Sequence, residues 1–131
     1  MSYGITVTTA QTFDATLVSV REALAEQGFG ILTEIDMAAT LKKKLDVDIP
    51  PQVILGACNP PLAYRALQEE ESIGLLLPCN VVVRSAGEGR TVVEALDPQI
   101  MVGVTGNDGL SSTSDDAAAL LRTALDSLGR S

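Results

Sequence analysis

Residues 79–96, CNVVVRSAGEGRTVVEAL, predict a β-hairpin, and this hairpin decides the fold. Each half is rich in valine, a composition typical of strands, and two glycines at residues 87–89 supply the turn. Consecutive strands joined by so short a turn run antiparallel. The residues do not by themselves define the register, and we expect Val81–Val83 to pair with Val92–Glu94.

On either side of the hairpin, helical and strand patterns alternate. Strands are predicted at residues 3–9, 31–35 and 53–58, and helices at residues 13–28, 36–45 and 60–70. Thr12, Asp36 and Asn59 are placed to cap these helices. We expect extended chain at residues 73–78 and 99–104, and a last helix from Ser114 to Gly129. This order predicts an α+β fold: one mainly antiparallel sheet with helices packed on a face.

The composition describes one domain, residues 1–131, with an aliphatic core. Hydrophobic residues make up 46% of the chain, yet it contains only two Tyr, two Phe and no Trp. No apolar run is long enough to span a bilayer, and the N-terminus lacks the basic and apolar regions of a signal peptide. We therefore expect a cytoplasmic protein with free thiols and no membrane partner.

Charge and missing residue types exclude many functions. A net charge of −8 opposes binding to nucleic acid, whose backbone is also negative. The chain contains no histidine, which excludes Ser-His-Asp and Cys-His catalysis and histidine-ligated zinc or haem. Its two cysteines are too few for a Cys-only zinc site, and no phosphate-binding glycine loop is present. The sequence predicts no catalytic residue and no metal site, and it identifies no cofactor.

The most distinctive chemical feature is a repeated Cys-Asn pair. Cys58 and Cys79 each precede an asparagine, Asn59 or Asn80, and each lies beside proline. If their strands are antiparallel neighbours, the two thiols lie at adjacent strand ends with both asparagines beside them. The helix that begins at Asn59 would lower the pKa of a nearby thiol, although Pro60 and its neighbour remove first-turn amides.

Five residues are therefore the candidates for a ligand-binding site: Cys58, Asn59, Cys79, Asn80 and Tyr64. Tyr64 lies in the helix after Cys58, where it either borders the same pocket or packs at a dimer interface. The alternative for each cysteine is structural, because free cysteine is among the most buried residue types and packs like a small hydrophobe.

Three parts of the chain, taken in order, resemble the DUF302 family, a group of small bacterial and archaeal domains. They are residues 35–36 (ID) with 41–45 (LKKKL), residues 55–60 (LGACNP) and residues 74–81 (GLLLPCNV). The resemblance extends over residues 3–128. It implies a TT1751-like fold, related in layout to the TATA-binding-protein fold, and a homodimer, but no activity. Asp46 departs from the family pattern, in which we expect a glycine after the lysine-rich helix.

Two functions from different classes follow from these observations. The first is a non-catalytic, homodimeric module that binds a small molecule or another partner; the aliphatic composition and the lack of acid–base residues favour it. The second is a thiol-dependent protein that uses Cys58 and Cys79 for redox exchange, sulfur transfer or Cu(I) binding.

Overall fold

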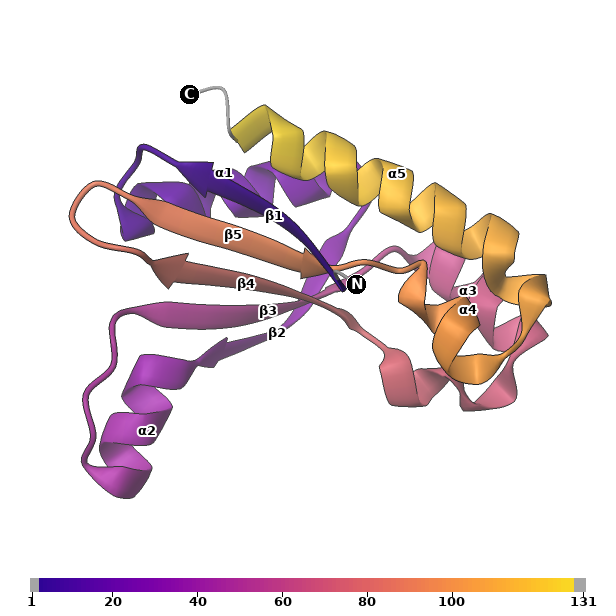
Figure 1. Ribbon diagram of the computed structural model, residues 1–131, viewed down its shortest axis with the longest axis horizontal. Helices are drawn as coiled ribbons and strands as arrows, with labels where there is room; N and C mark the ends of the chain where they lie inside the picture. The colour runs from indigo at the N-terminus through magenta and orange to yellow at the C-terminus, as the bar shows by residue number, and fades with distance from the viewer. Residues whose placement is uncertain (1–2, 129–131) are drawn as a thin grey trace.

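Five strands form one antiparallel sheet in the order β1-β5-β4-β3-β2, as the computed structural model of residues 3–128 shows (Figure 1). The strands are β1 Gly4–Thr9, β2 Gly30–Asp36, β3 Gln52–Cys58, β4 Cys79–Ser85 and β5 Thr91–Leu96. Every neighbouring pair is antiparallel. The predicted α+β class is confirmed. A short turn joins β4 to β5, whereas a helix lies in each of the β1–β2, β2–β3 and β3–β4 connections.

The register of the hairpin differs by one residue from the expected one. Val81 pairs with Ala95 and Val83 with Val93, because Ser85 pairs with Thr91 and residues 86–90 form the loop. Within this loop, the Ala86 amide donates to the Arg90 carbonyl over 3.0 Å. A shift of one residue moves every side chain to the other face of a strand, so this detail decides which valines are buried.

The helices are α1 Phe13–Glu26, α2 Met37–Leu45, α3 Pro60–Glu69, α4 Ile100–Thr105 and α5 Ser111–Leu128, with 3-10 turns η1 Glu71–Leu76 and η2 Asp108–Leu110. Thr12, Asp36 and Asn59 accept hydrogen bonds from the first turns of α1, α2 and α3, as predicted. Asp46 adopts a left-handed conformation, φ 55°, and ends α2. It does so in place of the glycine that is usual in this conformation.

Three expectations about the second half of the chain were wrong. Residues 71–76 form η1 instead of extended chain, because this turn buries Ile73 completely. Residues 100–105 form α4, which buries Met101 and ends at Gly106 in a left-handed conformation. Helix α5 begins at Ser111, three residues before the expected start, and the expected final residue, Gly129, lies outside the described residues.

The main core lies between the sheet and the two long helices, α1 and α5, which pack together on one face (Figure 1). Alternate strand residues supply it from the sheet side: Ile5, Val53, Leu55, Val81, Val83, Val93 and Ala95. A second, smaller core lies at the end of the sheet where α3, η1 and α4 gather. Ala66, Ile73, Met101 and Leu110 form it.

The other face of the sheet is covered by neither α1 nor α5 (Figure 1). Helix α2 lies on that side, at the β2 edge, and it contains no buried residue. The fold therefore offers three places for function: the end of the sheet beside α3, the open face, and the β2–α2 edge.

Candidate functional site

The antiparallel pairing of β3 with β4 brings Cys58 and Cys79 to neighbouring strand ends. Strand β3 ends at Cys58 and β4 begins at Cys79, but the residue across from Cys79 is Ala57. Because successive residues of a strand point to opposite faces, this register does not set the two thiols opposite each other. Both are free cysteines. The structure thus confirms the neighbouring strand ends and shows no facing pair of thiols.

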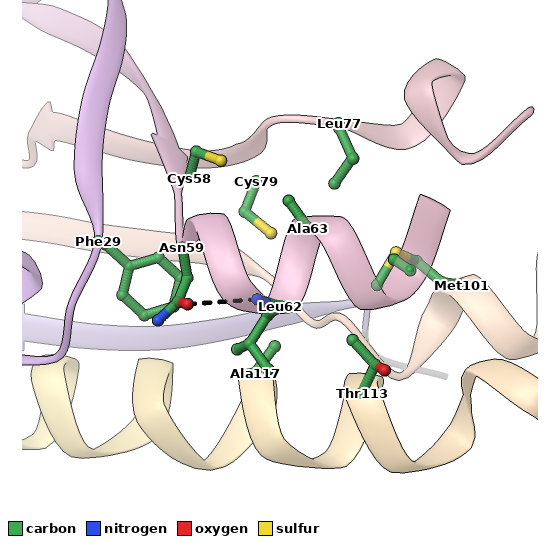
Figure 2. Close-up of a pocket in the computed structure, with 11 residues that line it drawn as sticks. Phe29, Cys58, Asn59, Leu62, Ala63, Leu77, Cys79, Met101, Thr113 and Ala117 are labelled. Atoms are coloured by element: carbon green, nitrogen blue, oxygen red, sulfur yellow. Dashed lines mark hydrogen bonds between the residues drawn. The ribbon is translucent and has the colours of Figure 1, made fainter. Parts of the chain in front are cut away.

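The two cysteines line a small apolar cavity beside helix α3 (Figure 2). Its other walls come from the loop between α1 and β2, from the residues just before β4, and from helices α3, α4 and α5. The residues are Phe29, Asn59, Leu62, Ala63, Ala66, Leu77, Met101, Thr113 and Ala117. The cavity measures about 30 Å³. A single water occupies roughly 10–15 Å³ on this measure, so the cavity has no room for an organic ligand as it stands.

Asn59 holds two elements together at the edge of this cavity. Its Oδ1 accepts a hydrogen bond from the Leu62 amide at 3.4 Å and so caps α3. Its Nδ2 donates to the Gln27 carbonyl at 3.2 Å, where α1 ends. Both ends of the side-chain amide are therefore occupied by the protein itself, which makes a structural role the direct explanation of this residue.

The Cys79 thiol is held in its neutral form. Burial raises its pKa from 9.0 to about 11, and the nearby Cys58 adds to the rise. Burial in apolar surroundings disfavours a thiolate because the charge loses its hydration. Cys79 is therefore a poor nucleophile at neutral pH.

Asn80 and Tyr64 lie away from this cavity. Asn80 follows Cys79 along β4, so its side chain belongs to the opposite face of the sheet, where it lines a second hollow. Tyr64 is 65% exposed on α3 and lines neither hollow. The structure thus brings together three of the five candidate residues: Cys58, Asn59 and Cys79.

The second hollow contains polar residues that sequence reasoning missed. Gln52 on β3, Arg84 on β4 and Glu94 on β5 line it. The Arg84 Nε donates to Glu94 Oε1 at 3.0 Å. The sequence does carry one signal, because Asn80, Val82 and Arg84 alternate with buried valines. The correct register was needed to place Glu94 on the same face as Arg84.

Two further observations concern residues 3–128 as a whole. In this range, His, Cys, Asp and Glu side chains nowhere gather in a group of three or more that would hold a metal ion. The described helices are also too short or too polar to cross a membrane.

Comparison with known proteins agrees with this architecture. The family model described as "Domain of unknown function DUF302" matches residues 5–128. The chain belongs to the DUF302 family. A crystal structure of an uncharacterized conserved DUF302 protein from Bacillus stearothermophilus superposes on this DUF302 domain with a TM-score of 0.90. The two are 30% identical, and the match covers 98% of this chain and 99% of the other. Among curated proteins, none matches the chain.

Proposed function

We propose that this DUF302 domain is a homodimeric, non-catalytic binding module whose two copies join through the β2–α2 surface. We define this surface as strand β2, helix α2 and the residues up to 48 that follow it. The observation that carries the proposal is the amount of apolar side chain exposed there. Leu32 is 65% exposed and Leu45 is 66% exposed, and Ile35 and Val47 are each more than two-fifths exposed.

Strand β2 pairs with β3 on one side and has no described strand on the other. Its residues are exposed or half-buried along its whole length. An edge strand of this kind presents unpaired amide and carbonyl groups together with apolar side chains, which favours pairing with another chain. A second copy related by a two-fold axis brings the same strand in antiparallel orientation, and the contact is then self-complementary.

Helix α2 supports the same assignment. Its apolar residues recur every four positions, at Met37, Leu41 and Leu45, and so form one stripe. None of them is buried, and Figure 1 shows α2 projecting from the sheet on the side away from α1 and α5. Packing against a second copy would remove this stripe from water, at about 25 cal/mol per Å² of apolar surface.

Charge favours a second copy over a charged partner on this surface. Residues 34–48 contain three lysines and four acidic residues, a net charge of −1, whereas the whole chain carries −8. Two copies of an acidic chain repel each other, and the repulsion is weakest where the local charge is close to zero. The β2–α2 surface meets this condition.

Light scattering coupled to gel filtration tests the proposal. The wild-type chain at micromolar concentration is expected to have the mass of two chains. The double variant Leu32→Lys/Leu45→Lys is expected to be monomeric, because it adds two lysines per chain, and so four positive charges, to the dimer contact. Leu75→Lys is the matched control: Leu75 is 87% exposed on η1, outside the β2–α2 surface, so this variant should stay dimeric. A monomeric wild type, or a dimeric double variant, contradicts the proposal; thermal unfolding followed by circular dichroism verifies that each variant folds.

A thiol-dependent function is the second candidate, favoured by one observation. Cys58 and Cys79 line the same cavity, and the thioether residue Met101 lines it as well. Sulfur ligands select Cu(I) among common metal ions. The raised pKa of Cys79 weighs against this candidate, because redox exchange, sulfur transfer and copper ligation all use the thiolate.

An anaerobic titration with Cu(I), followed by native mass spectrometry, separates this candidate from the first. One bound copper per chain, lost in Cys79→Ser and in Met101→Leu, would favour the thiol-dependent function. No bound copper, and no loss of two hydrogen atoms on mild oxidation, would leave the cysteines as packing residues.

A further inference from the structure

The open face of the sheet carries the larger of the two hollows, with a volume of about 410 Å³. Sites for small molecules usually enclose about 300–1,000 Å³, so this hollow is large enough where the cavity at the cysteines is not. Residues of β1, β3, β4 and β5 line it, and β2 contributes none. The hollow therefore shares no lining residue with the β2–α2 surface.

The hollow combines one positive and one negative group. Arg84 and Glu94 are joined by a single ion pair, Nε to Oε1 at 3.0 Å, and their side chains are 42% and 36% exposed. The other carboxylate oxygen of Glu94 accepts a hydrogen bond from the Thr6 hydroxyl at 3.2 Å. Within the part of the chain that the structure describes, the two terminal amino groups of Arg84 have no hydrogen-bond partner.

Neutral hydrogen-bonding groups and apolar surface complete the lining. The side-chain amides of Gln52 and Asn80 belong to the hollow and, among residues 3–128, bond to no other group. Val82 and Leu96 supply apolar surface beside them. Gly4, on β1, has no side chain to fill the space. The hollow thus offers donors for an anion, an acceptor for a cation and an apolar wall.

We propose that this hollow binds a small zwitterion, a molecule that carries a carboxylate beside an ammonium group and an apolar side chain. The free amino groups of Arg84 match a carboxylate in the two-pronged geometry that guanidinium groups prefer. Glu94 receives the ammonium, and Val82 and Leu96 contact the side chain. The proposal names a ligand class for the binding role proposed above, and it is independent of the dimer interface.

The balance of charge favours a zwitterion over a simple anion or cation. The chain as a whole carries a charge of −8, which repels a free anion. A simple cation gains from Glu94 but meets Arg84 beside it. A zwitterion satisfies both groups and adds no net charge to the hollow.

Nuclear magnetic resonance titration of the full chain with three matched probes tests whether the hollow binds a zwitterion. The probes are L-leucine, 4-methylpentanoate, which lacks the ammonium, and 3-methylbutylamine, which lacks the carboxylate. Leucine is expected to shift amide signals of residues 80–84 and 94–96 with saturation in the millimolar range. Each single-charge probe should bind at least about tenfold more weakly, the ratio that 1.4 kcal/mol of lost interaction produces.

Two variants and a control locate the binding. Arg84→Met and Glu94→Gln should each weaken leucine binding by about tenfold or more. Arg90→Met, in the exposed hairpin loop outside the hollow, should bind leucine like the wild type. Saturable leucine binding that survives Arg84→Met, equal binding of a single-charge probe, or no shifts with leucine would each overturn the ligand class. The mass measured by light scattering is independent of these results, so a failure here is distinguishable from a failure of the dimer.

Discussion

The side chain of Asn59 reaches the main-chain carbonyl of Gln27, 32 positions earlier, through a hydrogen bond of 3.2 Å. The same side chain caps α3 through the Leu62 amide. One residue therefore ties the end of α1 to the start of α3, next to the cavity that Cys58 and Cys79 line.

Replacing Asn59 tests this connection. Asn59→Ala removes both hydrogen bonds and is expected to lower the free energy of unfolding by about 1–2 kcal/mol. Asn59→Asp keeps the cap acceptor and loses the donor to Gln27, so its loss should be smaller. Urea unfolding followed by circular dichroism measures both. Equal stability of Asn59→Ala and the wild type would show that the two bonds contribute nothing.

A side chain at Gly56 is expected to destabilise the sheet. A Cβ atom there would overlap Thr33 Oγ1 on β2 and would lie 2.8 Å from Pro78 Cγ. Overpacking of this kind costs about 1–3 kcal/mol, which Gly56→Ala should show as a loss in urea unfolding. Gly74→Ala is the control, because no atom lies within 4 Å of a Cβ at that position.

A second substitution tests whether the overlap causes that loss. Thr33→Ala removes the hydroxyl that meets the new methyl group, so the double variant Gly56→Ala/Thr33→Ala should recover part of the stability. Additive losses in the double variant would argue against the steric explanation.

The raised pKa of Cys79 predicts a dependence of stability on pH. The folded thiol has a pKa of about 11 and the unfolded one about 9, so the unfolded chain loses its proton first as pH rises. The contribution of the protonated Cys79 thiol to the free energy of unfolding is fully present below pH 9. It is lost as pH rises from about 9 to about 11, by up to about 2–3 kcal/mol. Urea unfolding of the wild type and of Cys79→Ala at pH 8 and pH 10.5 should reveal it. The difference in stability between the two should shrink at the higher pH; a constant difference would refute the shift.

Asp46→Gly is expected to stabilise the chain by about 0.5–1 kcal/mol, because glycine adopts a positive φ without steric cost. Asp46 has φ 55° and pairs with Lys42 at 3.0 Å, an exposed contact that contributes little. Asp48→Gly is the control, since Asp48 also pairs with Lys42, at 3.4 Å, but does not have a positive φ. Heat-unfolding midpoints measure both, and a gain in both variants would mean that the loss of a negative charge from this acidic chain, not the backbone, is responsible.

The sequence by itself determined the features that depend on neighbours along the chain. Thr12, Asp36 and Asn59 cap the helices that follow them because a cap needs only the next three residues. The glycine turn after β4 predicted that β4 and β5 pair antiparallel, as they do. Together with the alternation of helices and strands, this was enough to predict the α+β class. The Cys-Asn segments were likewise sufficient for the family, which the match over residues 5–128 confirms.

Tertiary structure alone decided the features that depend on packing between distant segments. Residues 71–76 form the 3-10 turn η1 and residues 100–105 form helix α4, because Ile73 and Met101 complete a small core with Ala66 of α3. No local pattern reveals this packing. The one-residue difference in register placed Glu94 beside Arg84 and so created the charged hollow. Cys79 and Asn80 face opposite sides of the sheet because side chains alternate along a strand, and which side is buried depends on where α1 and α5 pack.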